Sequence, residues 1–304
     1  MKDSRWIPAL SWMAGAFALR TLLSSLVPLL PDETYYWEWT RRMQGGYFDH
    51  PPGIALLIRA GTLVFGDTRT GVRAGPAMAA LVTHIAAALL AFRLAGKGSD
   101  GYVAASRASA LIALMPLATL GLVLATPDAA LFMSAMLALL CVERALSASV
   151  RSRASTTWWM FAGVALGAAF VSKYTAVLLP MGLVIACVVH PALRARFREP
   201  GPWIAGAVAL TLFLPVVLWN RAQDWVSFRF QLGHGFNAGA RGNPLVRELE
   251  LIGGQLGLAS PILFVLLMVA VVGALRGGWC ARMEARPTDS AARQFAFAAV
   301  ALVP

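Results

Sequence analysis

The acidic side chains are the most informative residues of this sequence. Only 15 of its 304 residues are Asp or Glu, and a carboxylate at bilayer depth costs roughly 2.5–3.5 kcal/mol on insertion scales. Three acidic sets and one lysine stand beside long apolar stretches: Asp32-Glu33, Asp49-His50, Asp128 and Lys173. Carboxylates that meet a histidine and a lysine at a membrane surface can take up a proton and hold an anion. These residues form a candidate active site if the apolar stretches bring them to one face.

The composition is that of a membrane protein. The chain is 58% hydrophobic and 13% charged, whereas a soluble domain is about 45–50% apolar and roughly 25% charged. This excludes a soluble enzyme, a secreted disulfide-rich domain and a disordered region. The net charge of +11 is explained by an excess of Lys and Arg in cytoplasmic loops, so it does not indicate a nucleic-acid partner. The three cysteines are dispersed and odd in number, so they predict no disulfide framework.

Eight stretches are long and apolar enough for a helix across the roughly 30 Å hydrocarbon layer. They cover residues 7–30, 72–95, 103–125, 128–146, 157–173, 174–190, 203–219 and 249–275. A ninth begins near Gln294 and is cut at Pro304, so we expect a C-terminally truncated chain. The expected fold is all-α, polytopic and transmembrane, with residues 1–304 in one domain.

The basic residues predict which loops face the cytoplasm. They gather in every second connection, at residues 93–97, 144–153, 194–198 and 276–286. By the positive-inside rule, this distribution places the N-terminus in the cytoplasm and the chain in the inner membrane. All the acidic sets named above, with Lys173, then fall on the outer side.

Two long segments on that outer side are too polar or too short to be spans, at residues 31–71 and 220–248. Loops of this length in compact proteins are usually functional or disordered. The first is rich in Tyr and Trp, which is typical of elements that lie at a membrane interface. Within it we expect a helix from about Asp32 to Met43, and a second one over Pro52–Phe65, both lying along the membrane surface.

The motifs of these loops resemble those of a known family. Residues 31–37 (PDETYYW) and 46–52 (GYFDHPP), followed by Thr-Pro-Asp at 126–128, Ser-Lys-Tyr at 172–174 and FQLGHG at 230–235, resemble bacterial family 39 glycosyltransferases. These are similar to the protein O-mannosyltransferases and the lipid A aminoarabinose transferases. The resemblance implies a GT-C fold and an integral membrane glycosyltransferase. It would move a sugar from a polyprenyl-phosphate carrier to lipid A, a glycan or a protein on the periplasmic face.

The resemblance also implies roles for individual residues. Asp32 would be the general base, Glu33 would support it, and Asp128 would orient the acceptor or sugar. Lys173 would meet the lipid phosphate, aided by Arg59 or Arg241. The remaining residues expected to bind substrate are Tyr36, Tyr47, His50 and Tyr174, and His50 stands where the aminoarabinose transferases favour lysine. No cofactor is required, but Asp49 and His234 are candidate ligands for a divalent metal, because those relatives bind zinc with an acidic residue and a later histidine.

Other interpretations of the same residues stay open. Asp32 and Asp128 could simply stabilise helix N-termini, and Lys173 could extend its amine to the interface. A polytopic transporter or lipid flippase without catalytic chemistry is the alternative function, although transporters place ionisable residues nearer the bilayer midplane. An inactive remnant is a third. The sequence has no Asp-x-Asp triplet and no Gly-rich phosphate loop, so it favours a lipid-linked over a nucleotide-linked donor. The sugar and the acceptor are not specified.

Overall fold

The computed structural model describes residues 4–96, 98–115, 118, 121–189, 191–237 and 243–283. These residues form helices joined by turns, with no strand among them. The helices are η1 (Ser4–Trp6), α1 (Ile7–Leu26), α2 (Pro31–Trp39), α3 (Gly53–Phe65), α4 (Arg69–Leu94), α5 (Ser99–Leu114), α7 (Pro127–Ser147), α8 (Arg153–Ser172), η2 (Tyr174–Val177), α9 (Leu178–Val189), α10 (Pro191–Arg196), α11 (Pro200–Ala222), α12 (Val226–Asn237), α13 (Pro244–Ala259) and α14 (Pro261–Met283). The all-α architecture is as expected.

Five of the described helices are long and apolar enough to cross a membrane: η1 with α1, α4, α7, α8 and α11. Large apolar side chains on these helices are exposed, for example Leu22, Val164 and Leu210. The helices contact one another mainly through small residues. A Cβ at Gly163 of α8 would lie 2.5 Å from the Ala205 carbonyl oxygen of α11, so these two backbones approach closely. Exposed apolar faces and small buried residues are typical of helices packed in lipid.

Three expected spans differ from the structure. In the stretch 103–125 helix α5 ends at Leu114, because Met115 is extended (ψ 121°) before Pro116, and a residue before proline disfavours the helical region. The stretch 174–190 becomes the short helices η2 and α9. The stretch 249–275 is divided at Ser260, whose φ is +67°. The expected ninth span lies outside the described residues.

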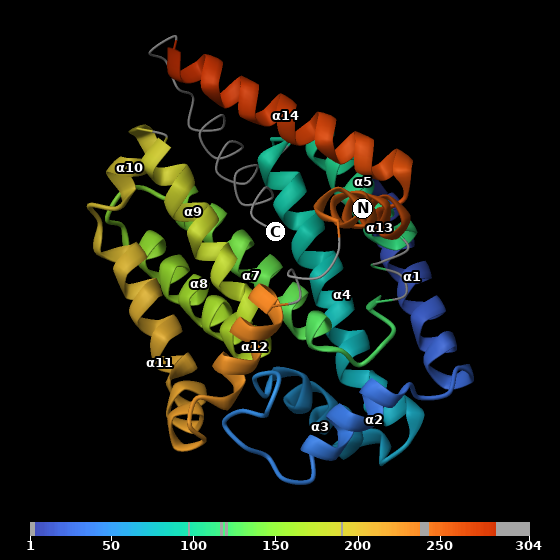
Figure 1. The fold of residues 1–304 in the computed structure, drawn as a ribbon. Coiled ribbons are helices and arrows are strands. Elements are labelled where there is room, and N and C mark those ends of the chain that lie inside the picture. Colours follow the sequence, from blue (N-terminus) through green and yellow to red (C-terminus); the bar gives the residue numbers. More distant parts are fainter. Residues whose placement is uncertain are drawn as a thin grey trace.

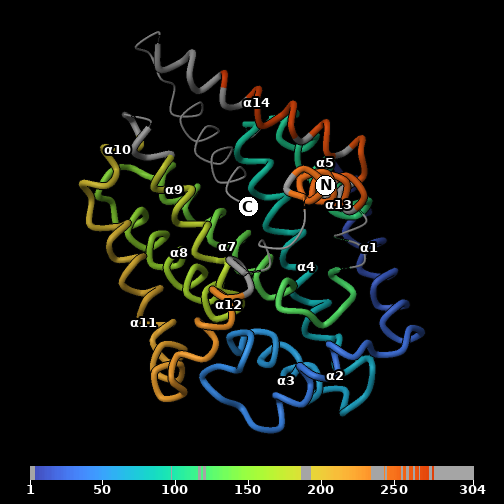
Figure 2. The backbone as a smooth tube through the Cα atoms, in the orientation of Figure 1, coloured from blue at the N-terminus to red at the C-terminus, as the bar shows by residue number. Residues whose placement is uncertain are grey.

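The first long outer segment and the α12 part of the second meet at one end of the helices, whereas residues 244–248 of the second begin α13 (Pro244–Ala259), which lies away from that end (Figure 1). The first contains α2 and α3, and the second contains α12, whose chain path beside them can be followed in Figure 2. Two hydrogen bonds join the segments: Ser227 Oγ donates to the Tyr47 carbonyl (2.6 Å), and Gln231 Nε2 donates to the Asp49 carbonyl (2.6 Å). The loops that sequence analysis placed on one side therefore lie together.

The first outer segment has a core of its own. Helix α2 ends at Trp39, earlier than expected, and Tyr36 and Trp39 point inward, whereas Met43 is exposed. Helix α3 has one buried face and one exposed apolar face, as expected of a helix that lies along an interface. The buried cluster contains Tyr36, Trp39, Tyr47, Ile54, Ala55, Ile58, Val72 and Ala125. Val72 belongs to α4 and Ala125 to the turn before α7, so this core holds α2 and α3 against those two elements.

Candidate functional site

Glu33 holds the start of α2 in place. Its carboxylate pairs with Arg73 of α4 through two hydrogen bonds, at 2.7 Å and 2.5 Å. It also accepts the backbone N–H groups of Leu30 and Ala125, both at 2.9 Å. Both side chains of the pair are buried. Burial acts to raise the pKa of Glu33, but the hydrogen bonds from Arg73 and from the two amides outweigh it and lower that pKa.

Arg73 extends this arrangement to α1. Its guanidinium also donates to three carbonyl oxygens at the end of that helix: those of Ser24, Val27 and Pro28, at 3.2, 2.8 and 2.9 Å. The Glu33–Arg73 pair thus joins α1, α2, α4 and the turn before α7. We expected Glu33 to act beside the base. Both of its oxygens are already bonded inside the protein, so the contacts that Glu33 makes in this structure hold α2 in position.

Asp32 is exposed at the first turn of α2. No other described residue makes a hydrogen bond or an ion pair with its carboxylate. The charge of the Asp32 carboxylate acts on the neighbouring Tyr36. Burial raises the pKa of Tyr36, and the negative charges of Asp49, Asp32 and Asp128 raise it further. Three carboxylates from separate parts of the sequence therefore surround one phenol, and Tyr36 stays protonated as a hydrogen-bond donor.

Lys173 and Asp128 form an ion pair at this same end. Lys173 Nζ lies 2.7 Å from Asp128 Oδ1, and the two side chains are 28% and 40% exposed. Asp128 stands in the first turn of α7, after Pro127. Lys173 is the extended residue at which α8 ends, so its side chain leaves the helix and reaches α7. A partly exposed pair of this kind contributes little stability, but it keeps an ammonium group available to an incoming anion.

Asp49 connects the two outer segments. Its carboxylate accepts a hydrogen bond from the Tyr35 hydroxyl (3.3 Å), and its carbonyl accepts the one from Gln231 of α12. Tyr174 is held nearby, because Asn220 of α11 donates to its hydroxyl (3.2 Å). Sequence analysis did not single out Asn220, although an amide in an apolar helix needs a partner and could have indicated it.

His50 is mostly enclosed, and its Nδ1 has no hydrogen-bond partner among the described residues. Burial lowers the pKa of His50, and the Lys173 ammonium lowers it further, against the opposing charges of Asp49 and Asp128. The imidazole is therefore neutral at pH 7. His50 is not a second phosphate-binding cation there, and Lys173 supplies the positive charge of the cluster.

Acid should destabilise the protein through His50. The pKa of His50 is lower in the folded state than the ordinary value of about 6.5, so the unfolded chain binds more protons below that value. Its contribution to stability is complete above about pH 6.5 and is lost as the pH falls through the folded pKa. We expect the fall in unfolding temperature between pH 7.5 and 5.0, measured in detergent, to be smaller for His50→Gln. An equal fall in both proteins would contradict this.

Four other expected site residues are placed differently or lie outside the description. Tyr47 is buried, its ring stacks on Trp39 at 4.1 Å, and its hydroxyl donates to the Trp39 carbonyl (2.9 Å), so it orders the loop beside a cavity that it helps to line. Arg59 is on the exposed side of α3 and makes no ion pair within the described chain. Arg241 lies outside the described residues. His234 belongs to α12, but its side chain lies outside the description as well.

A metal site is not assembled by the described side chains. No group of three or more His, Cys, Asp or Glu that could hold an ion is found among them. Asp49 is the one described member of the expected pair, and its carboxylate is bonded to Tyr35.

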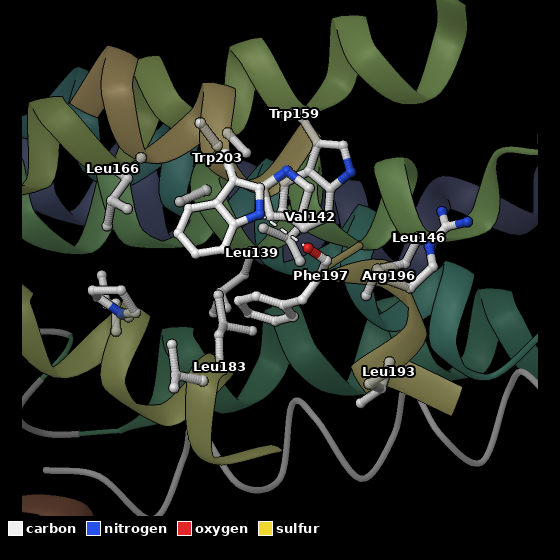
Figure 3. A pocket seen from close by; sticks show the side chains of 18 residues that line it. Leu139, Val142, Leu146, Trp159, Leu166, Leu183, Leu193, Arg196, Phe197 and Trp203 are labelled. Carbon is white, nitrogen blue, oxygen red and sulfur yellow. Dashed lines mark hydrogen bonds between the residues drawn. The ribbon is translucent and has the colours of Figure 1, made fainter. Parts of the chain in front are cut away.

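Two apolar cavities lie between the helices. The one in Figure 3 is at the end opposite the carboxylates, among α7 to α11, with Trp159, Phe197 and Trp203 in its wall. None of the candidate site residues lines it. A second cavity of about 490 Å³ is lined by Phe170, Tyr174, Val177, Leu210, Phe213, Phe228, Gln231 and Leu232. Because Tyr174 and Gln231 also border the polar cluster, this apolar cavity adjoins the candidate site.

The helices and the outer cluster define an α-helical integral membrane protein with a GT-C glycosyltransferase fold. ArnT from Cupriavidus metallidurans in the apo state is similar over 96% of this chain and 58% of that one, with a TM-score of 0.59 and 18% identity. The Pmt1–Pmt2 protein O-mannosyltransferase complex of S. cerevisiae, bound to the sugar donor, is similar over 76% of this chain and 34% of that one, with a TM-score of 0.53 and 17% identity.

The family follows from the sequence itself. The family model described as dolichyl-phosphate-mannose-protein mannosyltransferase matches residues 49–219, and the chain belongs to this family. The expected resemblance is confirmed. The matched residues include Asp49, His50, Asp128 and Lys173.

Two curated relatives are each 31% identical to this chain. The lipid A galacturonosyltransferase RgtD of Rhizobium johnstonii is 31% identical over 254 residues, which are 81% of this chain and 50% of that protein. The undecaprenyl phosphate-α-4-amino-4-deoxy-L-arabinose arabinosyl transferase of Pseudomonas paraeruginosa is 31% identical over 235 residues, 69% of this chain and 40% of that protein. The chain thus spans about half the length of the first relative and less of the second.

Proposed function

We propose that this chain carries the active site of an inner-membrane glycosyltransferase. The enzyme would transfer a sugar from a polyprenyl-phosphate carrier to lipid A or another envelope acceptor at the periplasmic face. One observation carries the proposal: Asp32, Asp49, Asp128 and Lys173, which are far apart in sequence, interact around Tyr36 and His50. The curated relatives act on lipid A or use an undecaprenyl-phosphate-linked sugar, by their names. No feature of the cluster favours the transporter alternative.

The orientation is part of the proposal. The cluster lies at the end of the helices opposite the loops that carry Arg93, Arg144 and Arg196. The positive-inside rule puts those loops in the cytoplasm, which puts the cluster at the outer water–lipid boundary. A carrier phosphate is found at that depth. Reporter fusions within residues 31–71 that showed a cytoplasmic location would contradict the orientation.

In the proposed reaction, Lys173 binds the carrier phosphate. Phosphate oxygens and the Asp128 carboxylate compete for the same ammonium, which is partly exposed and can turn toward either. As the bond between the anomeric carbon and the phosphate oxygen breaks, negative charge grows on the phosphate, and Lys173 stabilises that charge. The apolar cavity beside Tyr174 has the character needed for the first isoprene units of the carrier.

Asp32 is the proposed base. A base needs an oxygen that is not already occupied, and the four acidic residues differ in this respect. Glu33 has both oxygens bonded, and Asp128 and Asp49 each have one oxygen bonded, to Lys173 and Tyr35. Asp32 is exposed, and no other described residue forms a hydrogen bond or an ion pair with its carboxylate. Asp32 takes the proton of the acceptor hydroxyl while that oxygen attacks the anomeric carbon, and the polyprenyl phosphate leaves from the opposite side.

The test is the mass of the product. We expect purified envelope lipids from cells that express this chain to gain the mass of one sugar residue. The Lys173→Met variant should raise the donor KM and lower kcat/KM roughly 10–100-fold, the usual loss for one charge-assisted contact to the phosphate. A lengthened chain serves as the reference for acceptor binding. No added mass with either length, in membranes that contain the folded protein, would contradict the proposed function.

A further inference from the structure

Another cavity opens beside the carboxylate cluster. It has a volume of about 440 Å³ and lies between the first outer segment and the end of α11. Aromatic rings and side-chain amides line this cavity. They belong to Tyr35, Trp39, Gln44, Phe48, Trp219 and Gln223. This mixture differs from the hydrocarbon lining of the other two cavities.

The Trp219 indole is fixed before any ligand arrives. Its Nε1–H donates to Gln44 Oε1 at 2.8 Å. Its ring lies against the backbone of Gly46, where an added Cβ would come within 2.7 Å of the ring carbon Cε3. Gly45 makes the same close approach to Pro215, one helical turn earlier in α11. The two glycines therefore let the indole pack flat against the loop, which leaves it rigid beside the cavity.

The remaining polar and aromatic groups of the wall are accessible. Tyr35 is 44% exposed and Phe48 is 51% exposed, and the Gln223 side chain is exposed as well. A pyranose ring has a face of C–H groups, which packs on aromatic rings, and a rim of hydroxyls, which pair with amides that both donate and accept. An acyl chain would leave the amides unpaired. The lining therefore fits a saccharide better than a lipid tail.

Tyr35 belongs both to this cavity and to the carboxylate cluster, because its hydroxyl donates to Asp49. A sugar in the cavity thus lies next to Asp49, one of the carboxylates of that cluster. We propose that the cavity defined by Tyr35, Phe48, Trp219 and Gln223 binds a sugar ring of the acceptor. The acceptor is then a glycolipid or glycan hydroxyl, and a serine or threonine of a protein is disfavoured. This inference rests on the proposed function.

Direct binding is the first test. The probe is D-glucosamine, added to the full chain in detergent micelles and observed by saturation-transfer NMR. We expect the wild type to transfer saturation to the sugar, and Phe48→Ala or Gln223→Ala to bind it roughly 2–10-fold more weakly, the usual effect of one lost ring or amide contact. Phe65→Ala is the matched control, since Phe65 is 55% exposed and lies outside the cavity. No saturation transfer to the wild type, or equal binding by all variants, would overturn the proposal.

Kinetics with a lipid A acceptor is the second test. The cavity variants should raise the acceptor KM by the same factor and leave the donor KM unchanged. A rise in the donor KM alone would overturn the assignment, because it would place the cavity on the carrier side. If the wild type binds the sugar and Phe48→Ala does not, but no chain transfers any sugar, the cavity stands as a saccharide site and the proposed function fails. The saccharide site and the proposed function can therefore be refuted independently of each other.

Discussion

The Asp32→Asn variant is expected to lose transfer activity by about 10²–10⁴-fold in kcat, the contribution of a positioned general base. The amide has nearly the shape of the carboxylate but cannot take the acceptor proton. Its effect on stability should be small, about 0.3–1 kcal/mol, because Asp32 also interacts with the N-terminal dipole of α2. The measurement is single-turnover transfer with saturating donor, together with the unfolding temperature of the same preparation.

A matched control is available in the same outer segment. Asp67 is exposed and accepts a hydrogen bond from Trp37 Nε1 at 3.0 Å, which an asparagine oxygen can also accept. Asp67→Asn should therefore keep near wild-type kcat. Full activity in Asp32→Asn would assign the base to another group, and Asp49 is then the next carboxylate to replace.

The Glu33→Ala variant is expected to lose about 3–5 kcal/mol of stability, the usual result of removing one member of a buried ion pair. Arg73 would keep its charge without a counterion, and the amides of Leu30 and Ala125 would lose their acceptor. The readout is thermal unfolding in detergent, and activity should fall with the amount of folded protein. Arg73→Met should be destabilised to a similar degree.

The exposed pair of Glu38 and Arg41 is the comparison for this variant. Their side chains are 61% and 56% exposed and lie 3.9 Å apart. Glu38→Ala should change stability by less than about 1 kcal/mol, since solvent-exposed ion pairs contribute little. If Glu33→Ala were as mild as Glu38→Ala, the buried pair would not be what holds α2 in place.

The parts of the site that sequence reasoning found are those with a local signal. Asp128 follows a Thr-Pro helix start, Lys173 follows the end of an apolar stretch, and the aromatic motif of residues 31–52 indicates an interface. Their placement on one side followed from counting spans and basic loops. The outer cluster still lies together although α5 ends at Leu114 within the stretch 103–125, because the chain returns to the same end before α7.

The parts that were missed depend on contacts between distant residues. Glu33 and Arg73 are 40 positions apart, and each one alone looks like a candidate for chemistry. A signal did exist: an arginine and a glutamate in apolar surroundings each require a partner. The resemblance implies that Tyr47 binds substrate, and the structure adds that its buried hydroxyl is satisfied internally by the Trp39 carbonyl. Pro116 indicates the break after Met115, but the high hydropathy of the stretch 103–125 favours one continuous span.

The Glu33 carboxylate has one more effect, through its bond to the Ala125 amide. That bond links the turn before Asp128 directly to the helix turn that bears Asp32. The buried Glu33 side chain thus sets the distance between Asp32, the proposed base, and Asp128, the partner of Lys173. Engineering that aims to change which acceptor is glycosylated should leave this link intact and vary the rim of the aromatic cavity, where side chains are free to differ without moving either carboxylate.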